Sequence, residues 1–297
     1  MAKYWEDKSS QANHLRLYVA GEGWKASPDK LGEDGKTVEE HGSKSHLASA
    51  FLNALNATNL LVLTGAGTSF CAINAKEKLQ APGMSDLWNA VKTKVGEKVF
   101  CEVCTEFLNA KINDNIEKLL SLCKIYLELN EGADKKDAVK LRTEKFVKDA
   151  EQAILTRVGF VTPETAIDSH LLVVRKIGRR GVRKPRAKFF TTNYDLCFEE
   201  AARRQRFTII DGFSHSLDQV YDRSHFDYDI VRREAGKDAP DYIANVFHLY
   251  KLHGSLDWRR ISSEIVRSSG DEGFPGSGHE SALYTPLVRT NRQPWRW

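Results

Sequence analysis

Residues 59–69 decide the fold, and they read NLLVLTGAGTS. Four apolar residues in a row, Leu60 to Leu63, come just before Gly65-Ala66-Gly67. A continuous apolar run of this length that stops at glycines is typical of a fully buried parallel strand that enters a tight turn. The pattern therefore predicts the first strand of a parallel sheet.

Helical and strand patterns alternate on both sides of this stretch. Apolar residues at helical spacing predict helices over 46–58, 86–130, 135–158, 164–177 and 196–205. Short apolar runs predict further strands over 187–193, 207–210 and 246–255. The expected fold is α/β, with a Rossmann-like parallel sheet and a helical insertion at about 100–178. We expect a polar N-terminal arm at 1–44, followed by one domain over 45–297.

The composition fits a globular protein with a well-solvated surface. Of the 297 residues, 41% are hydrophobic and 28% are charged, and the formal net charge is +4. These values exclude a collagen-like or coiled-coil chain and argue against wholesale disorder. No apolar run is long enough for a membrane span. Five scattered Cys and the lack of a signal-peptide layout predict a cytoplasmic protein.

The glycine turn at 65–69 is a candidate phosphate site. Between a buried strand and a helix, such a turn lets backbone N–H groups approach a pyrophosphate. The full dinucleotide fingerprint needs a further Gly at a fixed offset, but Phe70 and Cys71 follow here. The same residues also fit a strand-ending turn that binds nothing.

Two more polar segments follow predicted strands. Residues 191–195, Thr-Thr-Asn-Tyr-Asp, lie where open α/β sheets bind ligands. Taken alone, Asn193 and Asp195 are better explained as caps of the next helix. His253 follows a later strand and can accept a proton near neutral pH, although a single His there more often bonds to backbone.

Together and in this order, the three segments resemble the sirtuin (silent information regulator) family. The likeness extends over residues 46–260 and implies that NAD is bound as a substrate. In sirtuins the first loop wraps the NAD pyrophosphate and ribose. The Asn and Asp after the second strand line the nicotinamide pocket, and the His is a base that acts on the nicotinamide ribose.

The resemblance carries over to individual residues of this chain. The implied catalytic residues are Asn193 and His253. The implied NAD-binding residues are Gly65, Ala66, Gly67, Thr68, Ser69 and Asp195. Our hypothesis is that Asn193 orients an attacking water and Asp195 holds the leaving carboxamide. His253 then hydrogen-bonds or deprotonates a ribose hydroxyl.

Several departures separate the chain from protein-deacetylating sirtuins. Their Gly-x-Pro-Asp-Phe-Arg segment is matched only by residues 83–88, Gly-Met-Ser-Asp-Leu-Trp, which lack the Arg. Thr192 stands where deacetylases have Gln. No Cys follows Cys197, so the two Cys pairs that hold the structural zinc of deacetylases are missing and we expect no zinc. Cys101 and Cys104 have zinc-like spacing, but without a second pair they fit a plain helix face.

The motifs look most like the sirtuin-like branch of bacterial anti-phage defence. This resemblance implies an NAD glycohydrolase that forms nicotinamide and ADP-ribose and depletes NAD in an infected cell. It also implies a homo-oligomer, with a HerA-type ATPase or another defence protein as a candidate partner. Two alternatives stay open: an NAD-dependent protein deacylase, and a non-enzymatic nucleotide-sensing subunit of a defence assembly.

A basic stretch and the end of the chain complete the pattern. Residues 175–188 contain eight Lys and Arg and no acid, which fits a phosphate-binding patch for DNA or RNA and equally a solvated loop. Sirtuin-like proteins also have a later strand with a Gly-containing turn that holds the adenosine half of NAD. Residues 281–297 contain no such pattern, so we expect this C-terminal strand to be missing.

Overall fold

The computed structural model divides into two compact units, Met1–Leu60 and Leu61–Trp297. The structure describes residues 280–281 and residues 16–267, the latter with gaps at 22, 27–28, 41, 77–78, 108–114, 133–136, 179, 218, 234–235, 237–240 and 262–263. The first 15 residues of the predicted polar arm and residues 282–297, where no adenosine-binding strand was found, lie outside the described residues.

The first unit contains two small hairpins and a helix. Its strands β1 (Arg16–Val19) and β2 (Gly23–Ala26) form one antiparallel pair, and β3 (Lys30–Leu31) and β4 (Val38–Glu40) form another. The rings of Tyr18 and Trp24 meet edge to face across the first pair, with centroids 5.3 Å apart. The helix predicted at 46–58 is confirmed as α1 (Lys44–Asn56).

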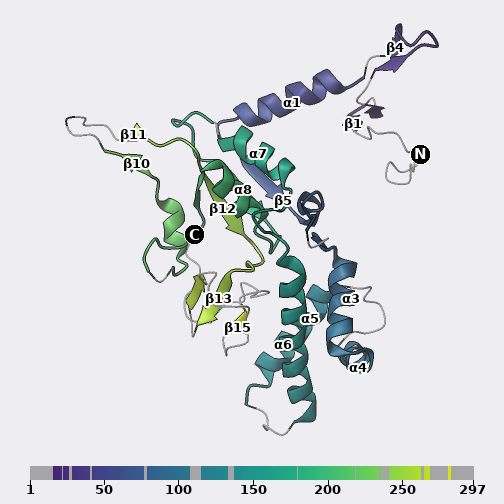
Figure 1. Ribbon diagram of the computed structural model, residues 1–297, viewed down its shortest axis with the longest axis vertical. Helices are drawn as coiled ribbons and strands as arrows, with labels where there is room; N and C mark the ends of the chain where they lie inside the picture. Colours follow the sequence, from purple (N-terminus) through teal and green to yellow (C-terminus); the bar gives the residue numbers. More distant parts are fainter. Residues whose placement is uncertain are drawn as a thin grey trace. The chain divides into compact units, whose positions relative to one another are not determined.

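A four-stranded parallel sheet organises the second unit (Figure 1). Its spatial order is β5 (Leu61–Thr64), β8 (Lys188–Thr191), β12 (Val246–Lys251) and β9 (Thr208–Ile210). The predicted Rossmann-like α/β fold is confirmed. β12 ends at Lys251, so the His-Gly pair that the predicted strand included lies in the following turn.

The buried aromatic side chains of the sheet pack against α8 (Cys197–Gln205). Phe189 of β8 is fully buried, and its ring lies 5.0 Å from that of Phe247 on β12 and 5.2 Å from that of Phe198 on α8. The ring of His170 on α7 (Asp168–Gly178) meets Phe198 edge to face at 5.0 Å. This packing fixes α8, and with it the loop that precedes α8, against the sheet.

Four helices share a second core. They are α3 (Met84–Val95), α4 (Glu97–Phe107), α5 (Ile116–Leu129) and α6 (Ala138–Val158). Their buried residues form one hydrophobic cluster, which also includes Tyr194 from the loop after β8. Asn115 and Asp137 accept hydrogen bonds from the first turns of α5 and α6 and fix where these helices begin. The shared core thus starts before residue 100, and α7 packs on α8 instead.

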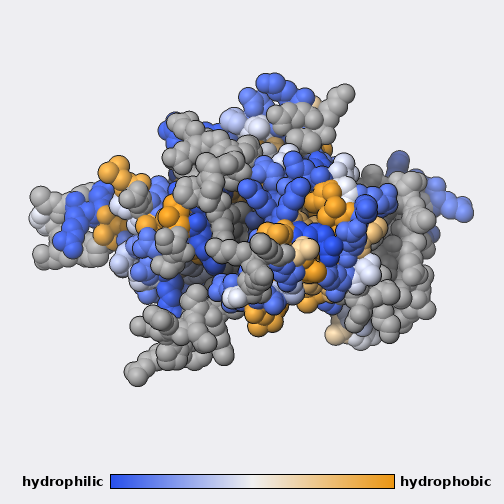
Figure 2. Space-filling model, turned by 90° about the horizontal axis from the view of Figure 1, so that it is seen from below, coloured by the Kyte–Doolittle hydropathy of each residue, from blue (hydrophilic) through white to orange (hydrophobic). Residues whose placement is uncertain are grey.

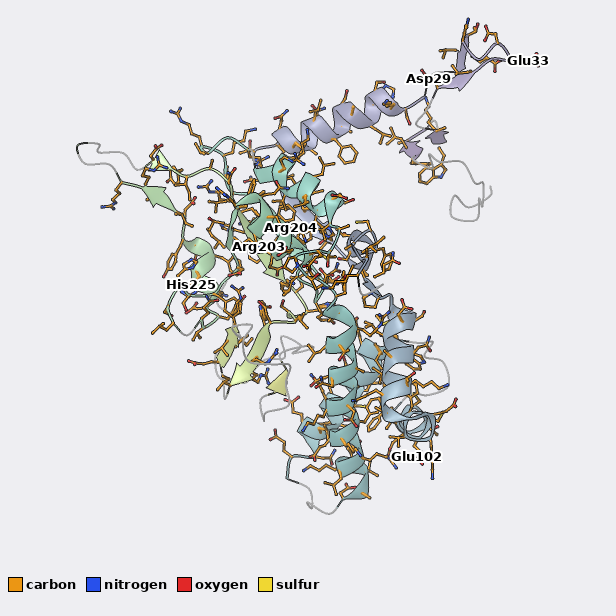
Figure 3. All side chains as sticks on the ribbon, in the orientation of Figure 1. Asp29, Glu33, Glu102, Arg203, Arg204 and His225 are labelled. Carbon is orange, nitrogen blue, oxygen red and sulfur yellow. The ribbon has the colours of Figure 1, made fainter. Side chains whose placement is uncertain are left out.

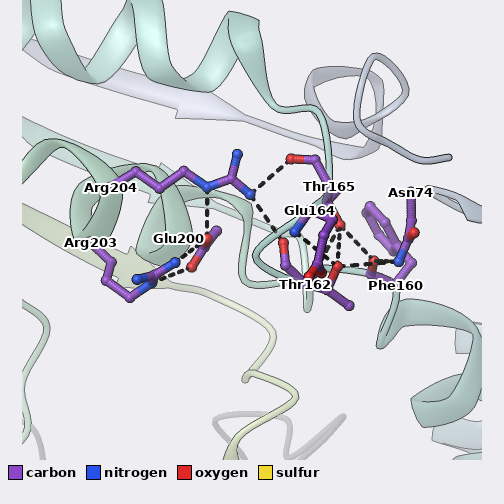
Figure 4. Close-up of polar contacts among 8 residues, drawn as sticks. All are labelled: Asn74, Phe160, Thr162, Glu164, Thr165, Glu200, Arg203 and Arg204. Atoms are coloured by element: carbon purple, nitrogen blue, oxygen red, sulfur yellow. Dashed lines mark hydrogen bonds and ion pairs between the residues drawn. The ribbon is translucent and has the colours of Figure 1, made fainter. Parts of the chain in front are cut away.

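The turn between α6 and α7 explains why α7 begins at Asp168, later than the predicted start near Pro163. The hydroxyl of Thr165 accepts a hydrogen bond from the Thr162 backbone N–H (2.8 Å) and donates to the Phe160 carbonyl (3.0 Å). Arg204 of α8 donates to the carbonyls of Thr162 and Thr165 (Figure 4). These bonds close a turn around Pro163 that excludes helical geometry there.

Smaller elements complete the second unit. They are α2 (Ala66–Ser69), β6 (Ile73–Asn74), β7 (Leu79–Gln80), the 3-10 helix η2 (Arg223–Asp227), β10 (Val231–Arg232), β11 (Asp241–Tyr242), β13 (Trp258–Ile261), β14 (Glu264–Arg267) and β15 (Glu280–Ser281). The strands β14, β13 and β15 form an antiparallel sheet that packs Trp258 against Phe213.

The surface agrees with the charged composition. On the face shown in Figure 2, hydrophilic side chains predominate and hydrophobic ones form small groups. None of the described helices combines the length and the apolar character needed to cross a bilayer.

Candidate functional site

The three predicted motifs meet at one edge of the parallel sheet. In the strand register Thr64 of β5 pairs with Thr191 of β8, which in turn pairs with Lys251 of β12. Because the strands are parallel and end at the same level, the segments that follow them emerge side by side. The glycine turn, the Asn-Tyr-Asp loop and the His-Gly turn therefore form one candidate site.

Asn193 connects the second motif to the first. Its Nδ2 donates to the Ser69 hydroxyl at 2.8 Å and to the Gly65 carbonyl at 3.1 Å. Its backbone N–H donates to the hydroxyl of Thr191 at 3.1 Å. These bonds hold the 8% exposed side chain in one orientation and use its donors within the protein. The amide oxygen is the part of Asn193 that remains for a ligand.

The glycine turn leaves its backbone open. Gly65 is extended and precedes the short helix α2, and its carbonyl also accepts the Thr68 N–H at 2.9 Å. A Cβ built on Gly67 would meet nothing within 4 Å, and one on Gly65 would meet only the Thr192 hydroxyl, at 3.5 Å. Neither glycine is required by the packing of the described residues. Their absence of side chains instead leaves room for a ligand to approach the backbone.

Asp195 serves the helix that follows it. One carboxylate oxygen accepts the Cys197 N–H at 3.0 Å, and the side chain is 8% exposed. The predicted N-cap role is wrong for both residues, because Leu196 is the N-cap of α8. Asp195, one position earlier, instead accepts the first N–H of the helix. Burial raises the pKa of the neighbouring Cys197 thiol far above its usual value, with Asp195 adding to the effect. Cys197 therefore stays a neutral thiol and is no candidate nucleophile.

His253 lies in the turn after β12 with its side chain exposed. Its ring is 6.2 Å from that of Tyr194, the residue between Asn193 and Asp195. The backbone N–H of Leu256 donates to the Tyr194 carbonyl at 3.0 Å, which holds the His253 turn against this loop. The next residue, Gly254, has φ +86°, a left-handed conformation that favours glycine and lets the chain turn away after His253.

Two residues of the site were not assigned a role from the sequence. Tyr194 is 5% exposed, and its hydroxyl donates to Glu117 of α5 at 3.0 Å. Lys251 donates its Nζ to the carbonyl of Asp195. An isolated lysine at the end of an apolar strand was the available signal for Lys251. No sequence signal pointed to the role of Tyr194, because its partner Glu117 is 77 positions away in the chain.

His170 is a buried titratable side chain beside the site. It is 1% exposed, and neither ring nitrogen has a hydrogen-bond partner among the described residues. Burial lowers its pKa, with Asp195 opposing the shift.

The lowered pKa of His170 predicts that stability depends on pH. Below about pH 6.5 the unfolded chain binds a proton at this residue, while the folded protein resists it. The contribution of His170 to the free energy of unfolding is therefore present above pH 6.5. It is lost as the pH falls towards the lower pKa that His170 has in the folded protein. We expect the thermal unfolding midpoint to fall less between pH 7.5 and 5.0 in His170→Phe than in the wild type. A matched His215→Phe change at an exposed position should leave the slope unaltered; equal slopes in all three proteins would contradict this assignment.

The basic stretch lies at the opposite end of β8 from these motifs. Arg186 forms a two-pronged ion pair with Asp229, at 3.0 and 2.9 Å, and its side chain is 8% exposed. Arg175, Lys176, Arg183 and Lys188 are exposed, and Arg179 lies outside the described residues. Arg203 and Arg204 project from α8, where both bind Glu200 (Figure 3). A nucleic-acid partner stays a prediction.

Metal ligation has no support among the described side chains. No group of three or more His, Cys, Asp or Glu residues there is arranged to hold an ion. Cys101 is exposed and Cys104 half-buried on α4, within the helical cluster.

Comparison with known protein families gives a match in the second half of the chain. Residues 187–290 match the family model of the SIR2-like domain, a range that begins just before β8 and includes Asn193, Asp195 and His253. No curated protein matches the chain. The C-terminal half of the chain therefore contains a SIR2-like domain, which confirms the predicted resemblance in this region and indicates NAD-related activity. The glycine turn at 65–69 lies outside the matched range.

Proposed function

We propose that this chain, whose C-terminal half contains a SIR2-like domain, is an NAD glycohydrolase that cleaves NAD to nicotinamide and ADP-ribose. The observation that carries the proposal is the fixed side chain of Asn193. It is bonded to the glycine turn on one side, and its loop contacts the His253 turn on the other. A substrate that contacted both the open glycine backbone and the His253 ring would place its reacting bond next to Asn193.

The reaction breaks the bond between the nicotinamide nitrogen and the anomeric carbon of the ribose. Such a bond breaks through a cation-like sugar with charge near the anomeric carbon. The amide oxygen of Asn193, which is not bonded to the described residues, accepts a hydrogen bond from the attacking water and orients it. The water oxygen bonds to the anomeric carbon as nicotinamide leaves with the bond's electron pair. The attacking water gives up one proton to the surrounding solvent, so the products are neutral nicotinamide, ADP-ribose and a proton.

His253 and Asp195 have distinct roles in this scheme. The exposed His253 hydrogen-bonds or deprotonates a ribose hydroxyl, which supplies negative charge next to the cation-like sugar. Asp195 already accepts the Cys197 N–H with one carboxylate oxygen, so its carboxylate accepts the N–H of the leaving carboxamide while remaining fixed. The glycine turn and Thr68 hold the pyrophosphate and ribose through backbone N–H groups and the Thr68 hydroxyl. Ser69, which the resemblance assigns to NAD binding, is 1% exposed and its hydroxyl instead holds Asn193.

The sequence departures favour hydrolysis over deacylation. The Cys pairs of the deacetylase zinc module do not follow Cys197, and residues 83–88 lack the Arg of the deacetylase segment. The proposed biological role is depletion of NAD during phage infection, by a homo-oligomer that acts alone or with a HerA-type ATPase. This role rests on the family resemblance.

A direct test uses the purified protein with NAD, in the presence and absence of an acetylated lysine peptide. Chromatography of nicotinamide and ADP-ribose is the readout. We expect both products without peptide. Release that requires the peptide would assign the protein as a deacylase. No release in either arm would overturn catalysis and favour a nucleotide-sensing subunit, which equilibrium binding of NAD to the same protein would then detect.

A further inference from the structure

We infer that Lys251 is a positioning residue of the candidate site: its buried ammonium group holds the Asn193–Asp195 loop against the His253 turn, and Glu199 holds that ammonium group in place. Lys251 is the last residue of β12 and lies two positions before His253. Its side chain is 2% exposed, although the site around it opens to solvent at His253. A lysine is rarely buried to this extent unless it is paired.

The contacts of Lys251 cross from one loop to the other. Its Nζ donates to the carbonyl oxygen of Asp195 and lies 3.0 Å from Oε1 of Glu199, in the first turn of α8. Two backbone bonds run alongside: Leu252 donates to the Thr191 carbonyl at 2.9 Å, and Leu256 donates to the Tyr194 carbonyl at 3.0 Å. Lys251 thus adds a side-chain hydrogen bond to two backbone hydrogen bonds that join the same segments.

The charge of Lys251 is retained by its surroundings. Burial lowers its pKa, but the carboxylates of Glu199, Asp195 and Asp257 outweigh this and leave it above the usual value. Burial raises the pKa of Glu199 to about 7, against the opposing effect of Lys251. A protonated lysine is the strong donor that a carbonyl oxygen needs for a firm bond in a buried place.

Glu199 is the counter-ion of Lys251, because the nearby Asp257 is paired elsewhere. Asp257 forms an ion pair with Arg267, in which Oδ2 lies 3.1 Å from Nε without hydrogen-bond geometry, and Arg267 also pairs with Asp211 just after β9. The second oxygen of Glu199, Oε2, is buried without a hydrogen-bond partner among the described residues. The Glu199 carboxylate therefore has Lys251 as its ionic partner. Removing Lys251 alone would leave this carboxyl group, which is 23% exposed, without its counter-ion and would raise its pKa further.

The test separates positioning from simple stabilisation with a double variant. Lys251→Met removes the bond to Asp195 and leaves Glu199 without its counter-ion. Lys251→Met with Glu199→Gln removes both charges at nearly constant volume, so it restores stability but not the bond to Asp195. For both variants we expect kcat for nicotinamide release to fall about 100-fold, because a small displacement of reacting groups has effects of this size. KM for NAD should change by less than about twofold, since the glycine turn is untouched.

The second measurement does not depend on the reaction, so it separates this inference from the proposed function on which the first rests. Hydrogen–deuterium exchange of residues 193–199, followed by mass spectrometry, should be about tenfold faster in the double variant than in the wild type. Exposed Lys188→Met, at the start of the neighbouring β8, is the matched control and should change neither readout. A double variant with wild-type kcat and wild-type exchange would overturn the inference. If the wild type releases no nicotinamide, the proposed function fails and exchange alone decides whether Lys251 positions the loop.

Discussion

His253→Ala is expected to lower the rate of nicotinamide release from NAD by at least about 100-fold, the scale of a lost proton acceptor. The same change should leave the free energy of unfolding within about 0.5 kcal/mol of the wild type, as is usual for exposed positions. The reason is its place in the structure: the side chain is exposed, and its ring contact is with Tyr194 at 6.2 Å. Enzyme assay and thermal unfolding on one preparation measure the two effects.

Asn193→Ala should lower the rate of nicotinamide release to a similar degree. Unlike His253→Ala, it should also lower the free energy of unfolding. It removes the 2.8 Å bond to Ser69, which is 1% exposed, and the 3.1 Å bond to Gly65. Leaving a buried hydroxyl without its donor costs about 1–3 kcal/mol. Exposed His215→Ala and Asn89→Ala are controls of the same residue types. Wild-type turnover in either His253→Ala or Asn193→Ala would show that the roles are wrongly assigned.

Phe189→Ala is expected to have the largest effect on stability, a loss of about 3–5 kcal/mol. The ring is fully buried between Phe247 of β12 and Phe198 of α8, so its removal leaves a cavity at the centre of the sheet layer. That loss is a large part of the total of about 5–15 kcal/mol for a typical domain. Chemical denaturation at constant temperature is the measurement.

The neighbouring residue provides a close control for Phe189. Phe190 has the same side chain on the opposite face of β8, where it is only half-buried and stacks on Tyr250 at 4.5 Å. Phe190→Ala should therefore cost clearly less than Phe189→Ala. If the two variants were equally destabilised, α8 would not depend on the buried face of the sheet as described.

The sheet and the grouping of the motifs could be predicted because both depend on local patterns. The patterns at 60–63 and 246–250 identified two strands, and polar residues directly after strands must meet once those strands are parallel neighbours. The predicted full burial of the first strand was wrong, because β5 is an edge strand on which Leu61 and Leu63 are exposed. The predicted start of α7 was wrong, because side-chain bonds of Thr162 and Thr165 close a turn that helix signals alone do not reveal.

The partners of the site residues could not be predicted. Asn193 bonds to Ser69 across 124 positions, and Lys251 reaches Asp195 across 56. Such pairs arise from the way the strands and the helical cluster pack, which residue spacing does not encode. Capping of α8 by Asn193 or Asp195 was predicted from their place before the helix, but the N-cap is Leu196 and Asp195 bonds to the Cys197 N–H from one position earlier.

Tyr194 has a consequence for how the protein unfolds. Its side chain belongs to the hydrophobic core of α3 to α6, and its backbone belongs to the loop that carries Asn193 and Asp195. We therefore expect the opening of the helical cluster and of this loop to be coupled through Tyr194, so that a ligand that orders the loop also stabilises the cluster. The four helices and the loop after β8 are then expected to unfold together, although the helices have a hydrophobic cluster of their own.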